Sequence, residues 1–178
     1  MFDNEYLFKG SHAVKVNKLT AKFPQSVNSL FKRNIDVFVF APIVGMLYNR
    51  MSDIDSGNET TKIFPGQFTN HHNDVYFTYR LVMLAVQKEK HSLNERVNKA
   101  FNGEAQGTAE EDFKIFEKYL LGGIDVLYEK LIEQDNPSSE DDYISNLNNF
   151  LAEIHERYEA EQDSSQDFLA KLEQIARE

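Results

Sequence analysis

The sequence contains no cysteine among its 178 residues. Disulfides, thiolate zinc sites, iron–sulfur clusters and cysteine nucleophiles are therefore excluded together. No apolar run approaches the roughly 18 residues that a transmembrane helix needs. The N-terminal stretch MFDNEYLFKG also lacks the basic and then apolar segments of a secretory signal. We therefore expect a cytoplasmic protein that makes no membrane contact.

Motifs for nucleotide binding and catalysis are missing as well. Neither GxxxxGK[ST] nor GxGxxG occurs, so no glycine-rich loop is expected to hold a phosphate. Ser11 is followed by His12, but adjacency in sequence does not give the geometry of a nucleophile and its base. We predict that the protein is not an enzyme and uses no cofactor and no metal.

The residues that are present can form a core. The chain is 41% hydrophobic, with 14 Phe and 8 Tyr, and its 27% of charged residues and mean hydropathy of −0.53 are typical of a soluble domain. Apolar residues recur mostly at helical spacing. The sequence predicts an all-α, single-domain bundle of about six or seven helices.

Two segments are expected to form the central helices. Residues 35–51 are apolar on nearly every side, which favours a buried helix over a buried strand; Pro42 should kink it or start a new helix, and Gly45 permits close backbone approach. The helix expected from Asn73 carries two apolar stripes, which predicts burial on two sides. The stripes are Val75, Tyr79, Val82 and Val86, and Phe77, Leu81 and Leu84.

Shorter signals locate other boundaries. Ser92 with Glu95 and Thr108 with Glu111 are spaced as capping boxes, which predicts helix starts at both places. The pair Gly122–Gly123 inside the second of these helices indicates a kink, a close helix crossing or a break. Near the N-terminus, residues 13–16 alternate as in a short strand or extended arm, and the residues after Pro24 are spaced as in a helix from Val27.

One long irregular loop is expected from Ser52 to Asn73, because this stretch is rich in Gly, Asn, Ser, Thr and Asp. A loop of this length is often functional, although a disordered surface loop fits equally. Asp53 and Asp55 resemble the start of a calcium loop, but the turn glycine and the closing glutamate of an EF-hand are out of register. His71 and His72 are adjacent, so their side chains would diverge on a helix.

The chain is expected to divide into residues 1–137, a helical core with an N-terminal arm, and residues 138–178, an acidic helical hairpin packed on that core. Asp163 to Ser165 is the predicted break of the hairpin. Apolar residues before it are spaced by three and four, as in a coiled coil. The seam covers about two heptads, so packing on the same chain is expected rather than a dimer. Its members are Ile144, Leu147, Leu151, Ile154 and Tyr158.

Charge is distributed unevenly along the chain. The net charge is +4 over residues 1–50, −1 over residues 51–107 and −13 over residues 108–178, which adds up to the overall −10. Both ends can be ordinary solvated helix faces, or they can recognise partners. The basic residues that could contact nucleic acid, within a larger complex only, are Lys9, Lys15, Lys18, Lys22, Lys32 and Arg33.

Two apolar stretches carry a resemblance to a known group of proteins. They are LFKRNIDVFVFAPIVGML, Leu30 to Leu47, and YLLGGIDVLYEKL, Tyr119 to Leu131. Both are similar to small helical accessory proteins that are encoded with bacterial DNA-phosphorothioation and other anti-phage defence genes. The resemblance implies a subunit or regulator beside a DNA-acting enzyme and carries no catalytic motif to transfer.

We therefore expect a non-catalytic protein–protein interaction module, an accessory subunit of a bacterial defence or DNA-processing assembly, which could also be a homo-oligomer. Its expected partner-binding residues are the apolar anchors Tyr48, Phe64 and Phe68, where exposed, and the acidic residues Glu140, Asp141 and Asp142. Two alternatives stay open. One is an acidic inhibitor that mimics nucleic acid, and the other is a metal-dependent enzyme that uses Asp53, Asp55, His71 and His72.

Overall fold

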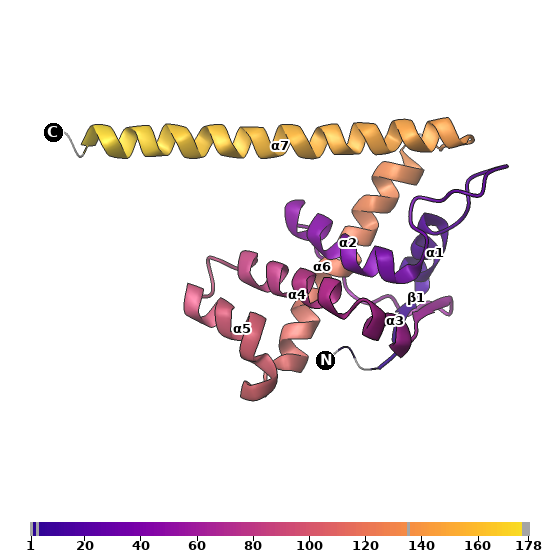
Figure 1. Ribbon diagram of the computed structural model, residues 1–178, viewed down its shortest axis with the longest axis horizontal. Helices are drawn as coiled ribbons and strands as arrows, with labels where there is room; N and C mark the ends of the chain where they lie inside the picture. The colour runs from indigo at the N-terminus through magenta and orange to yellow at the C-terminus, as the bar shows by residue number, and fades with distance from the viewer. Residues whose placement is uncertain (1, 3, 135, 176–178) are drawn as a thin grey trace.

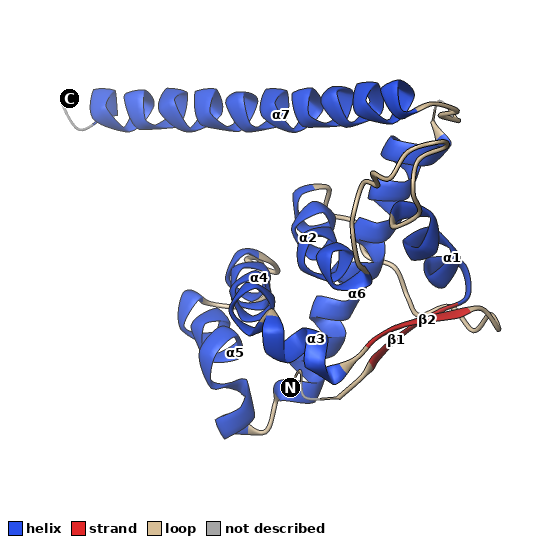
Figure 2. Cartoon of the chain, turned by 45° about the vertical axis from the view of Figure 1, so that its right-hand side comes forward, coloured by secondary structure: helices blue, strands red, loops and turns tan. Residues whose placement is uncertain are grey.

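The computed structural model describes residues 2, 4–134 and 136–175, with side chains described as far as residue 157 except that of residue 104. In these residues the structure has seven α-helices and one short two-stranded antiparallel sheet at an edge of the molecule, which confirms the all-α fold class (Figures 1 and 2). The elements in chain order are β1 (Tyr6–Lys9), α1 (Gly10–Leu19), α2 (Asn34–Leu47), β2 (Thr60–Ile63), α3 (Pro65–Asn70), α4 (His72–Ala85), α5 (Leu93–Gln106), α6 (Ala109–Tyr128), a π-helical turn (Glu129–Glu133) and α7 (Glu140–Ile175).

The crossing of α2 and α6 forms the centre of the core, and it is the most extensive contact between helices. Gly45 and Gly123 permit it: a Cβ on Gly45 would overlap the Tyr119 carbonyl, and one on Gly123 would overlap the Ala41 carbonyl. The predicted close approach at Gly45 and the helix-crossing reading of Gly122–Gly123 are therefore confirmed. The π-helical turn follows α6 directly, and α2 continues through Pro42 without a break.

The remaining helices pack around this crossing. α4 lies on α2, and α5 lies on both α4 and α6. On the other side, α1 packs on α6 and on β2, whose partner strand β1 pairs with it from Tyr6↔Ile63 to Lys9↔Thr60. Phe2 lies among core aromatic rings with centroid distances of 5.2–6.2 Å; these belong to Phe38, Phe68, Tyr76, Tyr79, Phe113 and Phe116.

The C-terminal segment is one helix, and the prediction of a hairpin there is wrong. α7 continues through residues 163–165, because three small or polar residues in a row weaken a helix without forcing it to turn. Figure 1 shows α7 along one side of the molecule, with its far end beyond the other helices. Among its described side chains, Phe150 is buried against Tyr48, whereas Ile144, Leu147 and Leu151 of the predicted seam are largely exposed.

Three other local predictions are also wrong. Residues 13–16 lie in α1, because Ala13 and Val16 share the buried face of a helix. No helix starts near Val27, which is 82% exposed; the surrounding chain closes through an isolated bridge between Lys22 and Ser29. The expected loop from Ser52 to Asn73 contains β2, α3 and the start of α4, so only its first part is irregular.

The predicted capping boxes have different outcomes. Ser92 and Glu95 form theirs: the Ser92 amide donates to the Glu95 carboxylate at 2.7 Å, and the Glu95 amide donates to Ser92 Oγ at 3.3 Å. Thr108 does not cap α6 through Glu111. Its hydroxyl instead donates to buried Asp112 at 2.7 Å.

Candidate docking groove

The helix α4 carries the two apolar stripes that its sequence predicts, but the protein covers the second one only in part. Val75, Tyr79 and Val82 of the first stripe are buried against the core. In the second stripe, on the outer side of the helix, Phe77 is 65% exposed, whereas Leu81 and Leu84 are half-buried. The prediction that both sides are buried is therefore wrong at Phe77.

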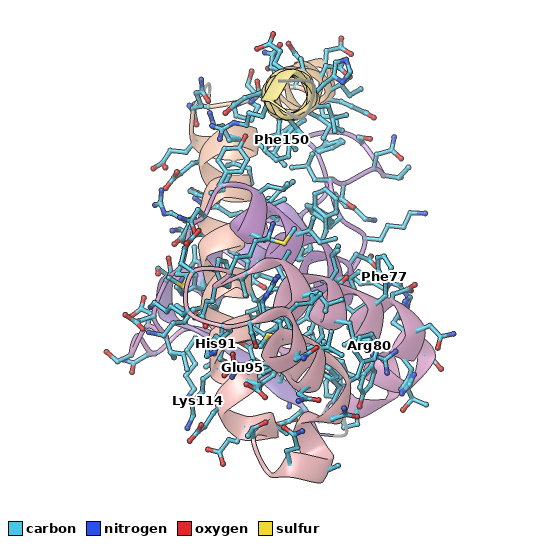
Figure 3. All side chains as sticks on the ribbon, turned by 90° about the vertical axis from the view of Figure 1, so that its left-hand side faces the viewer. Phe77, Arg80, His91, Glu95, Lys114 and Phe150 are labelled. Carbon is cyan, nitrogen blue, oxygen red and sulfur yellow. The ribbon has the colours of Figure 1, made fainter. Side chains whose placement is uncertain are left out.

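A groove of about 600 Å³ lies on this outer side, between α4 and α5. Most of its lining is apolar, and Phe101 on α5 is 54% exposed beside it. Figure 3 shows Phe77 and Arg80 on one outer face of α4, far from Phe150, which lies under α7. The full lining is His72, Asn73, Asp74, Tyr76, Phe77, Arg80, Leu81, Leu84 and Phe101.

Among the residues that line the groove, Arg80 is the one whose side chain is always positively charged; the other basic residue is His72. The Arg80 guanidinium lies 5.5 Å from the centroid of the Tyr76 ring and 5.0 Å from that of the Phe101 ring. Both distances are within the range of cation–π attraction. Among the described residues no carboxylate lies within ion-pair distance of Arg80, and Asp74, in the same lining, contacts His71 at 3.3 Å. Two rings therefore position a guanidinium that has no anionic partner in the described part of the chain.

Polar contacts fix α5 as the second wall of the groove. Buried Asp112 on α6 accepts hydrogen bonds from Lys99 Nζ at 2.6 Å and from Thr108 Oγ1 at 2.7 Å. Tyr79 donates through its hydroxyl to the Lys99 carbonyl at 3.2 Å, and Arg96 donates to the carbonyl of Leu84. The groove is therefore built on two helices that are anchored to each other and to the core.

A second polar cluster lies at the opposite side of the core, around Asp125 on α6. Lys15 Nζ donates to its carboxylate at 2.6 Å, Ser52 Oγ donates to the other oxygen, and His12 Nε2 lies 3.3 Å away. Burial opposes ionisation of Asp125, but the nearby His12 ring and the hydrogen bonds from Lys15 and Ser52 outweigh it and hold the pKa of Asp125 well below its usual range. All three side chains point at one carboxylate, so the cluster links α1 and the segment after α2 to α6.

The three apolar anchors predicted from the sequence lie in different environments. Phe68 is 2% exposed and belongs to the core, so its prediction as a surface anchor is wrong. Phe64 is 54% exposed, under Lys62 Nζ at 4.9 Å from the ring centroid. Tyr48 is half-buried, with Arg157 4.2 Å from its ring centroid; burial, together with the nearby Glu153 carboxylate, raises the pKa of Tyr48 to about 12.

The acidic residues predicted to bind partners begin α7, and two of them are engaged within the chain. Asp142 accepts hydrogen bonds from the amides of Ser138 and Ser139, both at 2.9 Å, and these bonds lower its pKa to about 2. Glu140 accepts a bond from Asn28 at 2.8 Å. Asp141 is exposed. This arrangement is the helix start that the serine and acidic residues of the sequence predict.

The basic residues predicted to contact nucleic acid divide in the same way. Lys15 binds Asp125, Lys18 donates to the Tyr128 hydroxyl at 2.9 Å, and Arg33 pairs with Asp36 at 2.7 Å. Among the described residues, the other three have exposed side chains outside any ion pair; they are Lys9, Lys22 and Lys32. Three of the six predicted basic residues thus bind side chains of the same chain.

The predicted metal loop separates into unrelated contacts. Asp55 accepts hydrogen bonds from the amides of Ser11 at 2.7 Å and Gly57 at 3.0 Å, which lowers its pKa to about 2. Asp53 pairs with Lys118 at 2.7 Å. His71 contacts Asp74, and His72 lies against Tyr76. In the part of the chain that the structure describes, no group of three or more His, Asp or Glu side chains is placed to hold a metal ion.

The groove residues were missed as a binding site, although their signal is in the sequence. Two apolar stripes on one helix mean either burial on both sides or burial on one side and a surface for another molecule. The exposed apolar residues of α5 follow the same logic, since Leu93, Val97 and Phe101 recur every four residues and are 62%, 37% and 54% exposed. Arg80, which lies beside these apolar residues, adds to the signal because arginine is common at protein interfaces.

The described residues therefore define an almost entirely α-helical protein with an exposed aromatic groove, and none of its helices is long and apolar enough to cross a membrane. The family model for DNA sulphur modification system-associated protein 4 matches residues 11–168, and the chain belongs to this family. The match covers both stretches that carry the resemblance to DNA-phosphorothioation accessory proteins, which is confirmed. Comparisons with curated proteins and with solved structures found no match.

Proposed function

We propose that this accessory protein of a DNA sulphur modification system is a non-catalytic interaction subunit that docks another protein of the system in the groove between α4 and α5. The observation that carries the proposal is the exposed aromatic lining of this groove. Large aromatic side chains and arginine are the residues that dominate binding energy at protein interfaces. Here Phe77, Phe101 and Arg80 lie together on one surface.

The energetic argument favours a surface that is covered in the working assembly. Burying an aromatic side chain stabilises a complex by roughly 1.5–3 kcal/mol relative to leaving it in water. Phe77 and Phe101 are more than half exposed in a chain whose other aromatic residues mostly pack in the core. Membership of an accessory family supports the existence of partners, and the cytoplasmic location expected from the sequence stays a prediction.

The test compares a double change in the groove with a single change at Phe64, the exposed anchor that the sequence predicts. The protein is produced together with the other proteins of its modification system and purified by a tag. The variant Phe77→Ser with Phe101→Ser should lose the co-purifying protein, because it removes the apolar lining on both walls. Phe64→Ser removes a side chain with the same exposure as Phe101 and should retain it. Retention by the groove variant, with the fold intact by circular dichroism, would refute the proposed surface.

The acidic nucleic-acid mimic is the alternative function. Its predicted carboxylates Glu140 and Asp142 are engaged within the chain, and this favours the interaction proposal. The metal-dependent enzyme is not supported by the contacts of Asp53, Asp55, His71 and His72 described above.

A further inference from the structure

The shape of the groove indicates what kind of segment it accommodates. α4 and α5 run antiparallel, because Tyr79 bonds to Lys99 while Arg96 bonds to Leu84. The apolar lining on α4 spans Phe77 to Leu84, which is about 10 Å at 1.5 Å per residue, and Phe101 of α5 faces it. Val97 and Leu93 continue from Phe101 along α5 as exposed apolar residues outside this lining. An apolar groove of this length fits about two turns of a third helix.

The charge in the groove indicates the chemistry of that helix. Arg80 is held between the rings of Tyr76 and Phe101 and has no carboxylate partner among the described residues. A helix that covers the apolar lining would remove this guanidinium from water, and an unpaired cation is costly to desolvate. A carboxylate on the docked helix would offset that cost through a charge-assisted hydrogen bond, which arginine can form with both carboxylate oxygens.

We propose that the groove binds an amphipathic helix of a partner protein, with apolar residues at positions i, i+4 and i+7 and an Asp or Glu opposite Arg80. The proposal rests on the proposed function and adds the chemistry of the occupant. Single-stranded nucleic acid also stacks on aromatic rings, but it needs a row of cations along its backbone. The lining supplies one arginine together with Asp74, so a protein helix fits better.

The first experiment identifies the occupant. A photo-crosslinking analogue of phenylalanine replaces Phe77 in the chain produced together with the other proteins of its modification system. The control places the same analogue at Val27, which is 82% exposed on the segment between α1 and α2. The proposal expects Phe77-specific crosslinks to one helical segment that has this apolar spacing and an acidic residue. Crosslinks to DNA, to α7 of this chain, to a second copy or to nothing would overturn it.

The second experiment tests the charge. Arg80→Gln should weaken binding of the crosslinked protein at least tenfold in calorimetry, and Arg80→Lys should restore part of it. Arg157→Gln is the matched control, since Arg157 also lies over an aromatic ring, that of Tyr48, and should change affinity less than twofold. If Phe77→Ser abolishes binding while Arg80→Gln has no effect, the acidic helix is wrong and the docking surface stands. If neither variant changes binding, the proposed function fails as well.

Discussion

At the scale of single residues, Asp125 shows how one carboxylate can hold a small helical fold together. It is 7% exposed and receives contacts from His12 and Lys15 on α1 and from Ser52 after α2. A buried carboxylate is stable only when donors satisfy it, so each of these contacts offsets the cost of its burial. The cluster therefore fixes how α1 and the segment after α2 lie on α6.

Replacing the carboxylate by an amide tests this role. Asp125→Asn should lower the free energy of unfolding by about 2–3 kcal/mol at pH 7, because Lys15 and His12 lose their anionic partner. The pKa of Asp125 is depressed in the folded state, so the stability that it contributes is fully present above the unfolded pKa of about 4, begins to fall below that pH, and is lost as pH falls through the depressed folded pKa. Urea unfolding at pH 7 and pH 3 measures both effects.

The control for this prediction is Asp53→Asn. Asp53 also pairs with a lysine, Lys118, but its side chain is 82% exposed, so the loss should be below about 1 kcal/mol. A difference between Asp125→Asn and the unmodified protein that stays constant from pH 7 to pH 3 would contradict the assigned role of the charge.

At the scale of helices, the groove depends on how α5 is attached. α5 packs on α4 and α6, and its charged contact with α6 is the pair of Lys99 with Asp112. The Asp112 carboxylate is fully buried. Removing one member of a buried pair is costly because the other stays buried without a partner, whereas replacing both by apolar residues is often neutral.

Lys99→Met should therefore destabilise the protein by about 3 kcal/mol and loosen α5. Hydrogen exchange should become faster in α5 than in α2, and binding at the groove should weaken. The double variant Lys99→Met with Asp112→Leu should recover most of the stability. Lys114→Met removes the exposed pair with Glu110 and should cost no more than about 0.5 kcal/mol. Equal losses for both lysine variants would contradict the anchoring role of Asp112.

The sequence predicted the central helices because their signals are local and strong. The apolar run from Ile35 and the glycine pair at Gly122–Gly123 both required a buried, closely packed helix, and the crossing of α2 and α6 satisfies them. The prediction of a helix from Val27 is wrong because three apolar residues at helical spacing are too few to distinguish a helix from an irregular segment. In the fold Phe23 stacks on Tyr143 of α7, a contact more than a hundred residues away that the local pattern does not contain.

The candidate site was harder to predict for a related reason. Periodicity shows which helix faces are apolar, but it does not show whether this chain or another molecule covers them. The periodicity of α4 therefore predicts a second buried face, although Phe77 on that face is exposed. Likewise, Phe68 was indistinguishable from Phe64 in sequence, although only Phe64 is exposed. Which apolar residues remain at the surface follows from tertiary packing, which a single sequence does not contain.

At the scale of the whole molecule, the fold determines which of the unevenly distributed charges can contact a partner. Lys15, Lys18 and Arg33 of the basic end are engaged with side chains of the same chain, as are Glu140 and Asp142 of the acidic end. The net charge of −10 still acts at long range on the rate of association. At contact range the groove offers the Arg80 guanidinium, which has no carboxylate partner among the described residues, and the Asp74 carboxylate beside His71, within a mostly apolar lining.

This distinction gives a prediction for the dependence of binding on salt. A helix docked in the groove forms one close ion pair, so its Kd should rise by less than about tenfold between roughly 50 and 200 mM NaCl. A nucleic-acid mimic that replaces six or more phosphates in a basic channel should lose about 10³-fold or more. The measurement is titration of the partner at both salt concentrations, with Arg80→Gln showing a smaller dependence than the unmodified protein. A steep dependence that Glu140→Ser with Asp141→Ser removes would favour the mimic instead; Asp142 is kept in that variant because it caps α7.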